Sequence, residues 1–305
     1  MPFVDKSGKF FLRRAFALLE NCAKLCYNRT KEKMQMQKFL TDIHTHSKFS
    51  SDGRDELAVM LSSAQEKGVG FYGVAEHFNY EQNETDGDID ADAYFHTARH
   101  LQEDYAGVMN VLVGAEFGFG KKPKAHALYL EVCEKYSPDF IVNSVHMLDG
   151  VDYYFKHIFY NQEKGERVLR DRKEVYEEYL SAIYESLFVP YPYDIVGHIG
   201  YAGRYAPYEQ KGIAYAEFKS AYDRILKEIV ARDKILELNG KGLIPSADVL
   251  AGYYALGGRK VSYASDAHDT KGQLVNRERA MGILKEIGFT YLTVPCRGEH
   301  IKVEI

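Results

Sequence analysis

The sequence has few cysteines and no long apolar run. Only four of its 305 residues are cysteine (Cys22, Cys26, Cys133 and Cys296), and none forms a CxxC pair. A disulfide framework is therefore not expected, and the chain fits a reducing compartment, which we predict to be the cytoplasm. No stretch approaches the roughly 18 consecutive apolar residues that a membrane-spanning helix needs. The N-terminal segment carries charges through its apolar portion, which argues against a secretory signal peptide.

Positive charge is also scarce. The formal net charge is -5, and no basic run is present. Non-specific binding to nucleic acid is therefore not expected, and a nuclease with a basic groove is disfavoured. An acidic protein can still bind an anionic ligand when metal ions supply positive charge locally. We expect a small phosphate monoester as the partner, with no nucleic acid and no membrane, and the sequence leaves the oligomeric state open.

The chain divides into a short N-terminal segment and one large repeating region. Apolar residues recur at helical spacing over residues 8–27, so we predict an N-terminal helical extension over residues 1–37. Alternatively, translation starts at Met34 or Met36, just before the first predicted strand. Residues 38–305 form the predicted catalytic domain, which is long enough for one large domain.

From residue 38 onward, short strands alternate with helices seven times. Such alternation predicts an α/β fold with a parallel sheet, and seven units without a linker favour a closed or nearly closed barrel. The predicted strands cover residues 39–44, 71–77, 111–118, 140–146, 194–200, 235–240 and 260–268, with a short last strand at 291–294. The predicted helices cover residues 55–68, 90–107, 124–137, 165–187, 214–233, 246–257 and 275–288.

Histidines and carboxylates gather where these strands end. Six of the eleven histidines lie at carboxyl ends of predicted strands, where a barrel of this type carries its chemistry. In "HTH", residues i and i+2 of a strand face the same way, so two imidazoles can bind one ion. The predicted metal ligands are His44, His46, Asp52, His77, Glu116, His146, His198, Asp266 and His268.

This set of ligands limits both the metal and the chemistry. Imidazole and carboxylate without thiolate suit Zn, Fe or Mn, and nine ligands suit two or three ions that share a carboxylate, for which we choose Glu116. The positive charge of three divalent ions would exceed the negative charge of Asp52, Glu116 and Asp266, and the surplus positive charge would attract a phosphate dianion. Clustered ions also generate hydroxide at neutral pH and stabilise an in-line displacement at phosphorus.

The order of the motifs "DIHTH", "AEH", "GAEFG", "NSVH", "GHIG" and "SDAH" resembles the PHP (polymerase and histidinol phosphatase) superfamily. The resemblance runs from about Phe39 to the C-terminus and is greatest to the stand-alone histidinol-phosphate phosphatases. It implies a distorted seven-unit (β/α) TIM-like barrel with three divalent ions. It also implies hydrolysis of L-histidinol phosphate in histidine biosynthesis, by a hydroxide that the metals hold.

The same resemblance implies how the ligands are shared among the ions. The first ion would be held by His44, His46, Glu116 and Asp266, the second by Glu116, His146 and His198, and the third by Asp52, His77 and His268. Within this set we expect Asp52, Glu116 and His268 to act in catalysis. The general acid for the leaving group is not identified by the sequence.

Substrate contacts are expected from residues around the barrel mouth. Arg204 lies six residues after His198 and is suited to a bidentate phosphate contact, although a solvated loop arginine is the alternative. Lys241 follows the sixth strand and is a second candidate. His157 belongs to an aromatic loop, with residues 153–155, that either covers the mouth or packs. Glu76 should point away from its neighbour His77, and packing or a supporting hydrogen bond is expected for it rather than direct metal ligation.

Three other functions remain open. The first is a related phosphoesterase that acts on a nucleotide, a sugar phosphate or phosphotyrosine. The second is an amidohydrolase-type metal hydrolase, which usually uses a bridging lysine where this chain has Glu116. The third is a metal-binding module without catalysis.

Overall fold

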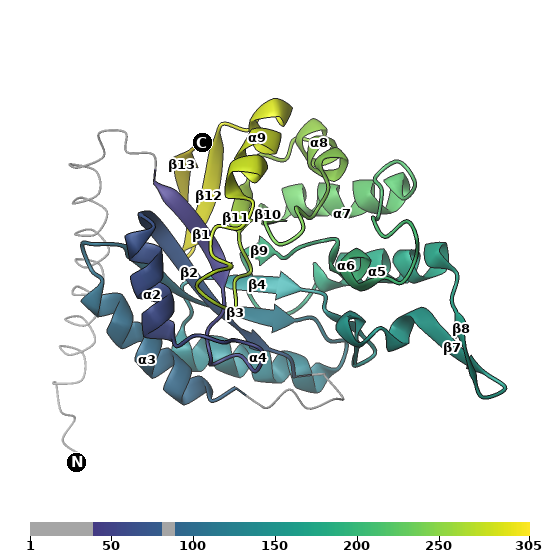
Figure 1. Cartoon of the computed structure of the whole chain (residues 1–305), viewed down its shortest axis with the longest axis horizontal. Coiled ribbons are helices and arrows are strands. Elements are labelled where there is room, and N and C mark those ends of the chain that lie inside the picture. The colour runs from purple at the N-terminus through teal and green to yellow at the C-terminus, as the bar shows by residue number, and fades with distance from the viewer. Residues whose placement is uncertain (1–38, 81–88) are drawn as a thin grey trace, which may run out of the picture. The chain divides into compact units, whose positions relative to one another are not determined.

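The computed structural model describes residues 39–80 and 89–305 of the chain. Its centre is a sheet of seven strands in the order β1-β2-β3-β4-β9-β10-β11, and every neighbouring pair is parallel (Figure 1). The strands therefore follow one another in space as they do in the sequence. They are β1 (Leu40–Thr45), β2 (Val69–Phe78), β3 (Asn110–Gly118), β4 (Ile141–Ser144), β9 (Ile195–Val196), β10 (Ile235–Asn239) and β11 (Val261–Ala264).

The first and last strands of this sheet meet, so the barrel is nearly closed. The amide of His46 donates to the carbonyl oxygen of Ala267 at 2.8 Å, and the amide of Asp266 donates to that of His44 at 3.0 Å. The Asp42 carboxylate strengthens this seam by accepting from the Ser265 amide at 2.7 Å. The predicted seven-stranded barrel is thus confirmed, and its closing contacts involve residues next to the predicted ligands.

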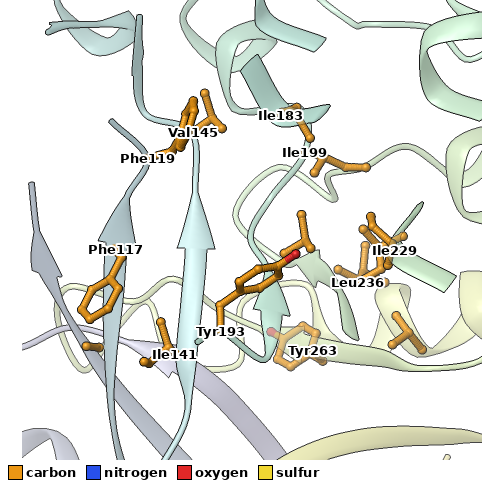
Figure 2. Packing of buried hydrophobic residues seen from close by; sticks show 14 of the residues in the cluster. Phe117, Phe119, Ile141, Val145, Ile183, Tyr193, Ile199, Ile229, Leu236 and Tyr263 are labelled. Carbon is orange, nitrogen blue, oxygen red and sulfur yellow. The ribbon is translucent and has the colours of Figure 1, made fainter. Parts of the chain in front are cut away.

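Helices cover the outside of the barrel (Figure 1). Along each strand, alternate side chains face the helices, as Leu236 and Leu238 of β10 do. Figure 2 shows Phe117 of β3 and Leu236 among the residues of this outer core, with Ile183 and Ile229 from two covering helices. No described helix is long and apolar enough to cross a membrane. The helices are α2 (Leu57–Glu66), α3 (Ala91–Asp104), α4 (Pro123–Tyr136), α5 (Arg172–Ser186), α6 (Tyr201–Tyr205), α7 (Lys219–Ala231), α8 (Ala247–Ala255) and α9 (Arg277–Ile287).

The barrel interior is apolar toward the amino ends of the strands and polar toward their carboxyl ends. The apolar part is a second buried cluster, to which β3 contributes Leu112 and β10 contributes Ile235. Farther along the same faces lie Glu116 and Glu237, both fully buried. An antiparallel hairpin of β12 (Tyr291–Cys296) and β13 (Glu299–Glu304) adds Val294 and Val303 to the apolar part. The predicted last strand is therefore one arm of a separate hairpin.

An irregularity in β1 lets this strand serve both parts of the interior. The pairing of β1 with β2 shifts between Asp42 and Thr45. A bulge of this kind re-aims the side chains that follow it. Ile43 accordingly joins the apolar cluster, while His44, the next residue, faces Glu116 and Glu237. Gly73 lies against the bulge, because a Cβ there would come within 2.5 Å of the Ile43 carbonyl oxygen.

The loop after β4 contains more structure than the sequence indicates. It forms two antiparallel hairpins and two short 3-10 turns, with the second hairpin projecting from the barrel (Figure 1). These elements are β5 (Met147–Leu148), β6 (Val151–Asp152), η1 (Tyr153–Phe155), η2 (His157–Phe159), β7 (Tyr160–Glu163) and β8 (Glu166–Leu169).

The predicted helix over residues 165–187 is therefore wrong in its first part. Lys164 and Gly165 have φ values of 51° and 87°, which form a tight hairpin turn, and residues 166–169 form a strand. Helix α5 begins only after Asp171, whose carboxylate accepts from the amides of Lys173 and Glu174. The predicted helix over 214–233 likewise begins late, at Lys219. The predicted helix over 8–27 lies outside the described residues.

Candidate metal centre

The ends of the parallel strands bring the predicted ligands into one cluster, which we call the ligand cluster. Four groups of three residues could each hold a metal ion, because the three donor atoms of a group lie within 4.8 Å of one another. All of these residues belong to the predicted set. The groups are His44, His46 and Asp266; His44, Glu116 and His198; His77, Glu116 and His146; and His46, His77 and His268. Asp52 adjoins them at the rim of the barrel.

Distances between donor atoms test whether metal ions fit this cluster. Two nitrogens on one tetrahedral zinc ion, each at about 2.0–2.1 Å from it, are about 3.3 Å apart. The Nε2 atoms of His44 and His46 lie 3.1 Å apart, and those of His146 and His198 lie 3.4 Å apart. His46 Nε2 lies 3.5 Å from Asp266 Oδ1. These spacings, together with donors that are all imidazole or carboxylate, fit divalent ions such as zinc.

Glu116 lies at the centre of the cluster and is fully buried. Its Oε1 lies 3.1 Å from His146 Nε2 and 2.9 Å from His198 Nε2. Its Oε2 lies 3.3 Å from His44 Nε2 and 2.7 Å from His77 Nδ1. The contact with His77 lacks hydrogen-bond geometry. Within the described residues, His77 Nδ1 and Glu116 Oε2 are therefore buried polar atoms without a hydrogen-bond partner. A carboxylate with imidazoles on both oxygens is suited to bridge two ions.

The exposed side of the cluster contains Asp52, His77 and His268. Asp52 lies 2.9 Å from His268 Nε2 and 3.6 Å from His77 Nε2, and its side chain is 59% exposed. Backbone contacts fix the two loops concerned, because the Arg54 amide donates to the His268 carbonyl oxygen at 2.8 Å. The cluster is therefore buried at Glu116 and open to solvent at Asp52.

Two supporting residues were not anticipated from the sequence. Glu237 Oε2 lies 2.8 Å from His44 Nδ1, which leaves Nε2 of that ring facing Glu116. The hydroxyl of Ser144 donates to Glu116 Oε1 at 2.6 Å. Hydrogen bonds of this kind orient metal ligands and raise their basicity. The available signal was the "LELN" alternation, which places a carboxylate in the middle of a buried strand.

The pKa values of neighbouring imidazoles in the ligand cluster are shifted in opposite directions. Burial alone would lower the pKa of His77, but the nearby Glu116 carboxylate raises it to about 9. Burial and the charges of His77 and His268 hold the pKa of His46 well below its ordinary value. Metal ions bind the neutral ring, so they must displace protons from the raised groups, and metal affinity should increase with pH.

Two of the three predicted substrate-binding residues lie beside the ligand cluster. Arg204, which lies in α6 rather than in a loop, donates from Nη1 to Asp266 Oδ2 at 3.2 Å and from Nη2 to Asn239 Oδ1 at 3.1 Å. Lys241 Nζ lies 3.9 Å from the same Asp266 oxygen and is half-exposed. Both cations therefore lie beside the cluster, although the Arg204 guanidinium already has carboxylate and amide partners.

His157 is not brought to the ligand cluster. It lines a cavity of about 540 Å³ together with Arg170 and Glu178, and none of the lining residues belongs to the cluster. Glu76 also stays outside the groups of donor atoms, and accepts from the Ser47 and Ser50 hydroxyls at 2.6 Å each. Its hydrogen bonds thus support the loop that follows β1.

Comparison with known proteins gives consistent similarities. The sequence profile of the PHP domain matches residues 42–241. A "Probable histidinol-phosphatase" of Thermotoga maritima is 30% identical over 266 residues, which cover 84% of this chain and 95% of the relative. A histidinol-phosphatase of Lactococcus lactis is 25% identical over 254 residues, covering 81% of this chain and 91% of the relative.

A solved structure has the same fold. The crystal structure of histidinol phosphate phosphatase from Lactococcus lactis, in complex with zinc, L-histidinol and phosphate, superposes with a TM-score of 0.77 at 24% identity. The match covers 86% of this chain and 99% of that chain.

Proposed function

Because the chain belongs to the PHP domain family, we propose that it is a metal-dependent phosphomonoesterase that hydrolyses L-histidinol phosphate to L-histidinol and phosphate. The observation that carries the proposal is the ligand cluster, in which imidazoles surround both oxygens of the buried Glu116. The names of the relatives support the choice of substrate. A role in histidine biosynthesis, in the cytoplasm, follows from that substrate.

We assign three divalent ions (Zn, Fe or Mn) to the cluster. The first ion is assigned to His44, His46, Glu116 and Asp266, the second to Glu116, His146 and His198, and the third to Asp52, His77 and His268. The donor spacings and the absence of thiolate support this assignment. Residues 38–305 form the catalytic domain in this proposal, and residues 1–37 form an extension.

Bound divalent ions would supply Lewis-acid charge and would lower the pKa of a water that they hold toward neutrality. The chain itself holds and orients the groups around them. Glu237 fixes the tautomer and direction of His44, and Ser144 fixes the Glu116 carboxylate. Asp52 is largely exposed and lies 2.9 Å from His268 Nε2, so its carboxylate forms the side of the cluster that faces bulk water. We assign the catalytic roles to Asp52, Glu116 and His268.

Positive charge at one edge of the cluster supports phosphate binding. Arg204 and Lys241 both lie against Asp266, which they partly neutralise. The half-exposed Lys241 ammonium can move toward a phosphate oxygen, whereas Arg204 is held by its own hydrogen bonds. We assign Lys241 to phosphate binding and Arg204 to phosphate binding and to the positioning of Asp266. The predicted contact of His157 with substrate has no supporting geometry in the described residues.

Phosphate release from metal-replete protein tests the proposal. L-Histidinol phosphate is compared with nucleotides, sugar phosphates and phosphotyrosine, and His268→Ala is the control because His268 belongs to the cluster. We expect a strong preference for L-histidinol phosphate and its loss in the variant. Turnover of another ester alone would retain the metal chemistry and replace the substrate. No release from any ester would contradict the phosphatase assignment and favour the amidohydrolase alternative.

A further inference from the structure

A buried carboxylate beside the ligand cluster has no role in the chemistry described so far. Asp152 is only 9% exposed. Strands β5 and β6 turn through Asp149 and Gly150, whose φ values of 52° and 79° fit a tight hairpin. The hairpin pairs Asp152 with Met147, the residue after the cluster member His146. Asp152 is thereby fixed next to the metal centre by the backbone.

Within the described residues, Asp152 has no lysine or arginine as an ion-pair partner. It accepts hydrogen bonds from the Tyr154 amide at 2.7 Å and the Tyr201 hydroxyl at 3.3 Å, and no lysine or arginine of residues 39–80 and 89–305 lies within ion-pair distance. Burial raises the pKa of this carboxyl, and its hydrogen bonds and the neighbouring His146 and His77 offset this rise only in part. Buried carboxylates are generally paired with a cation, because desolvating an unpaired charge is costly. A cationic ligand would supply the missing partner.

Aromatic side chains extend from the ligand cluster past Asp152 to the protein surface. The Tyr201 ring lies 5.0 Å from the His146 ring and 5.3 Å from the His198 ring. Tyr205 lies 5.0 Å from Tyr201 and 5.3 Å from Tyr154, which is 57% exposed. These side chains form a wall that is suited to a flat ring and to a cation.

Building on the proposed function, we propose that Asp152 binds the protonated amino group of the substrate while the phosphate occupies the ligand cluster. In an amino-alcohol phosphate the ammonium lies on the carbon next to the one that carries the ester oxygen. A carboxylate that recognises it must therefore lie immediately beside the groups that hold the phosphate. Asp152 meets this condition, and Arg204 and Lys241 lie beside another cluster member, Asp266. Asp152 is then the residue that selects amino-alcohol phosphates.

The test compares two substrates that differ only in the amino group. L-Histidinol phosphate and imidazolylpropyl phosphate are assayed with the wild type, Asp152→Asn, Asp152→Glu and the matched control Asp149→Asn, all metal-replete. A charge-assisted hydrogen bond predicts that the wild type prefers the amino substrate in kcat/KM by about 10- to 100-fold. Asp152→Asn should lose this preference, mainly through KM, Asp152→Glu should retain part of it, and Asp149→Asn should retain all of it.

Calorimetric binding of L-histidinol gives a readout that is independent of turnover. We expect its Kd to increase about 10-fold or more in Asp152→Asn and to stay unchanged in Asp149→Asn. Equal preference of the wild type for both substrates, or equal losses on both in Asp152→Asn, would overturn the inference while leaving the phosphatase assignment intact. Failure of the wild type to hydrolyse L-histidinol phosphate, with turnover of other esters, would instead overturn the proposed substrate.

Discussion

Replacement of Glu237 by glutamine tests whether the ligand cluster depends on a residue that is not itself a ligand. Glu237 is fully buried, and its two oxygens have different partners: Oε2 contacts His44 Nδ1 at 2.8 Å, and Oε1 accepts from Asn239 Nδ2 at 2.9 Å. A glutamine has the same size but only one acceptor oxygen. Either the His44 contact or the Asn239 contact is therefore lost in Glu237→Gln.

The structure sets the expected magnitude. Loss of a carboxylate that supports a histidine ligand typically lowers metal affinity 10- to 100-fold, or about 1.4–2.8 kcal/mol. Burial lowers the pKa of His44, but Glu116 and Glu237 raise it well above its ordinary value. Removing the Glu237 charge therefore also weakens proton binding at His44, which competes with metal binding. We expect the lower half of the range at neutral pH, which is about 10- to 30-fold.

Competition with a chromophoric zinc chelator measures this change directly. Glu185→Gln is the matched control, because it makes the same substitution on the half-exposed face of α5, where Glu185 pairs with Lys121. The control should retain wild-type affinity. If Glu237→Gln folds with wild-type stability and binds zinc with unchanged affinity and stoichiometry, the orienting role of Glu237 is refuted.

Further predictions concern stability. Chelation of the bound metal should lower Tm by about 5–10 °C in calorimetry, because a ligand at a thousandfold excess over its Kd stabilises the fold by about 4 kcal/mol; an unchanged Tm would contradict a structural contribution of the metals. Gly73→Ala should lower the free energy of unfolding in urea by about 1–3 kcal/mol, because its Cβ would approach the Ile43 carbonyl oxygen. The control Gly282→Ala, in α9 with open space around the new Cβ, should be neutral or stabilising by up to about 1 kcal/mol. Asp171→Ala should cost about 1 kcal/mol in the same assay by removing the cap of α5, and no loss would contradict the capping role.

The sequence predicts the barrel because each βα unit is a local pattern. Short apolar runs that alternate with amphipathic segments predict the parallel sheet, and the barrel rule then places His44, His146 and His198 at one mouth. Their meeting requires no knowledge of which side chains touch. The nine donors could be named for the same reason, since they all lie at or after the carboxyl ends of predicted strands.

Residues that act through a specific pairing could not be found in this way. Glu237 lies in mid-strand, and its importance depends on a contact with His44, which is remote in the sequence. The hairpin of β7 and β8 was missed because "GERVLRDR" has a composition that also suits a helix. The left-handed conformation of Lys164 and Gly165 and the antiparallel pairing of β7 with β8 distinguish the hairpin from a helix. Asp152 likewise adjoins the segment that the sequence predicts as an aromatic loop, and its position beside the ligand cluster depends on the hairpin of β5 and β6.

The seam of the barrel has a consequence for synthesis of the chain. The amides of His46 and Asp266 donate to the carbonyl oxygens of Ala267 and His44, and these contacts join β1 to the segment after β11. Three of these four residues, His44, His46 and Asp266, belong to the ligand cluster. A nascent chain that has not yet emerged beyond His268 lacks both the seam and the last donors. A ribosome-bound fragment that ends before β11 lacks Asp266 and His268, so in the proposed assignment it could not provide all donors of the first and third ions.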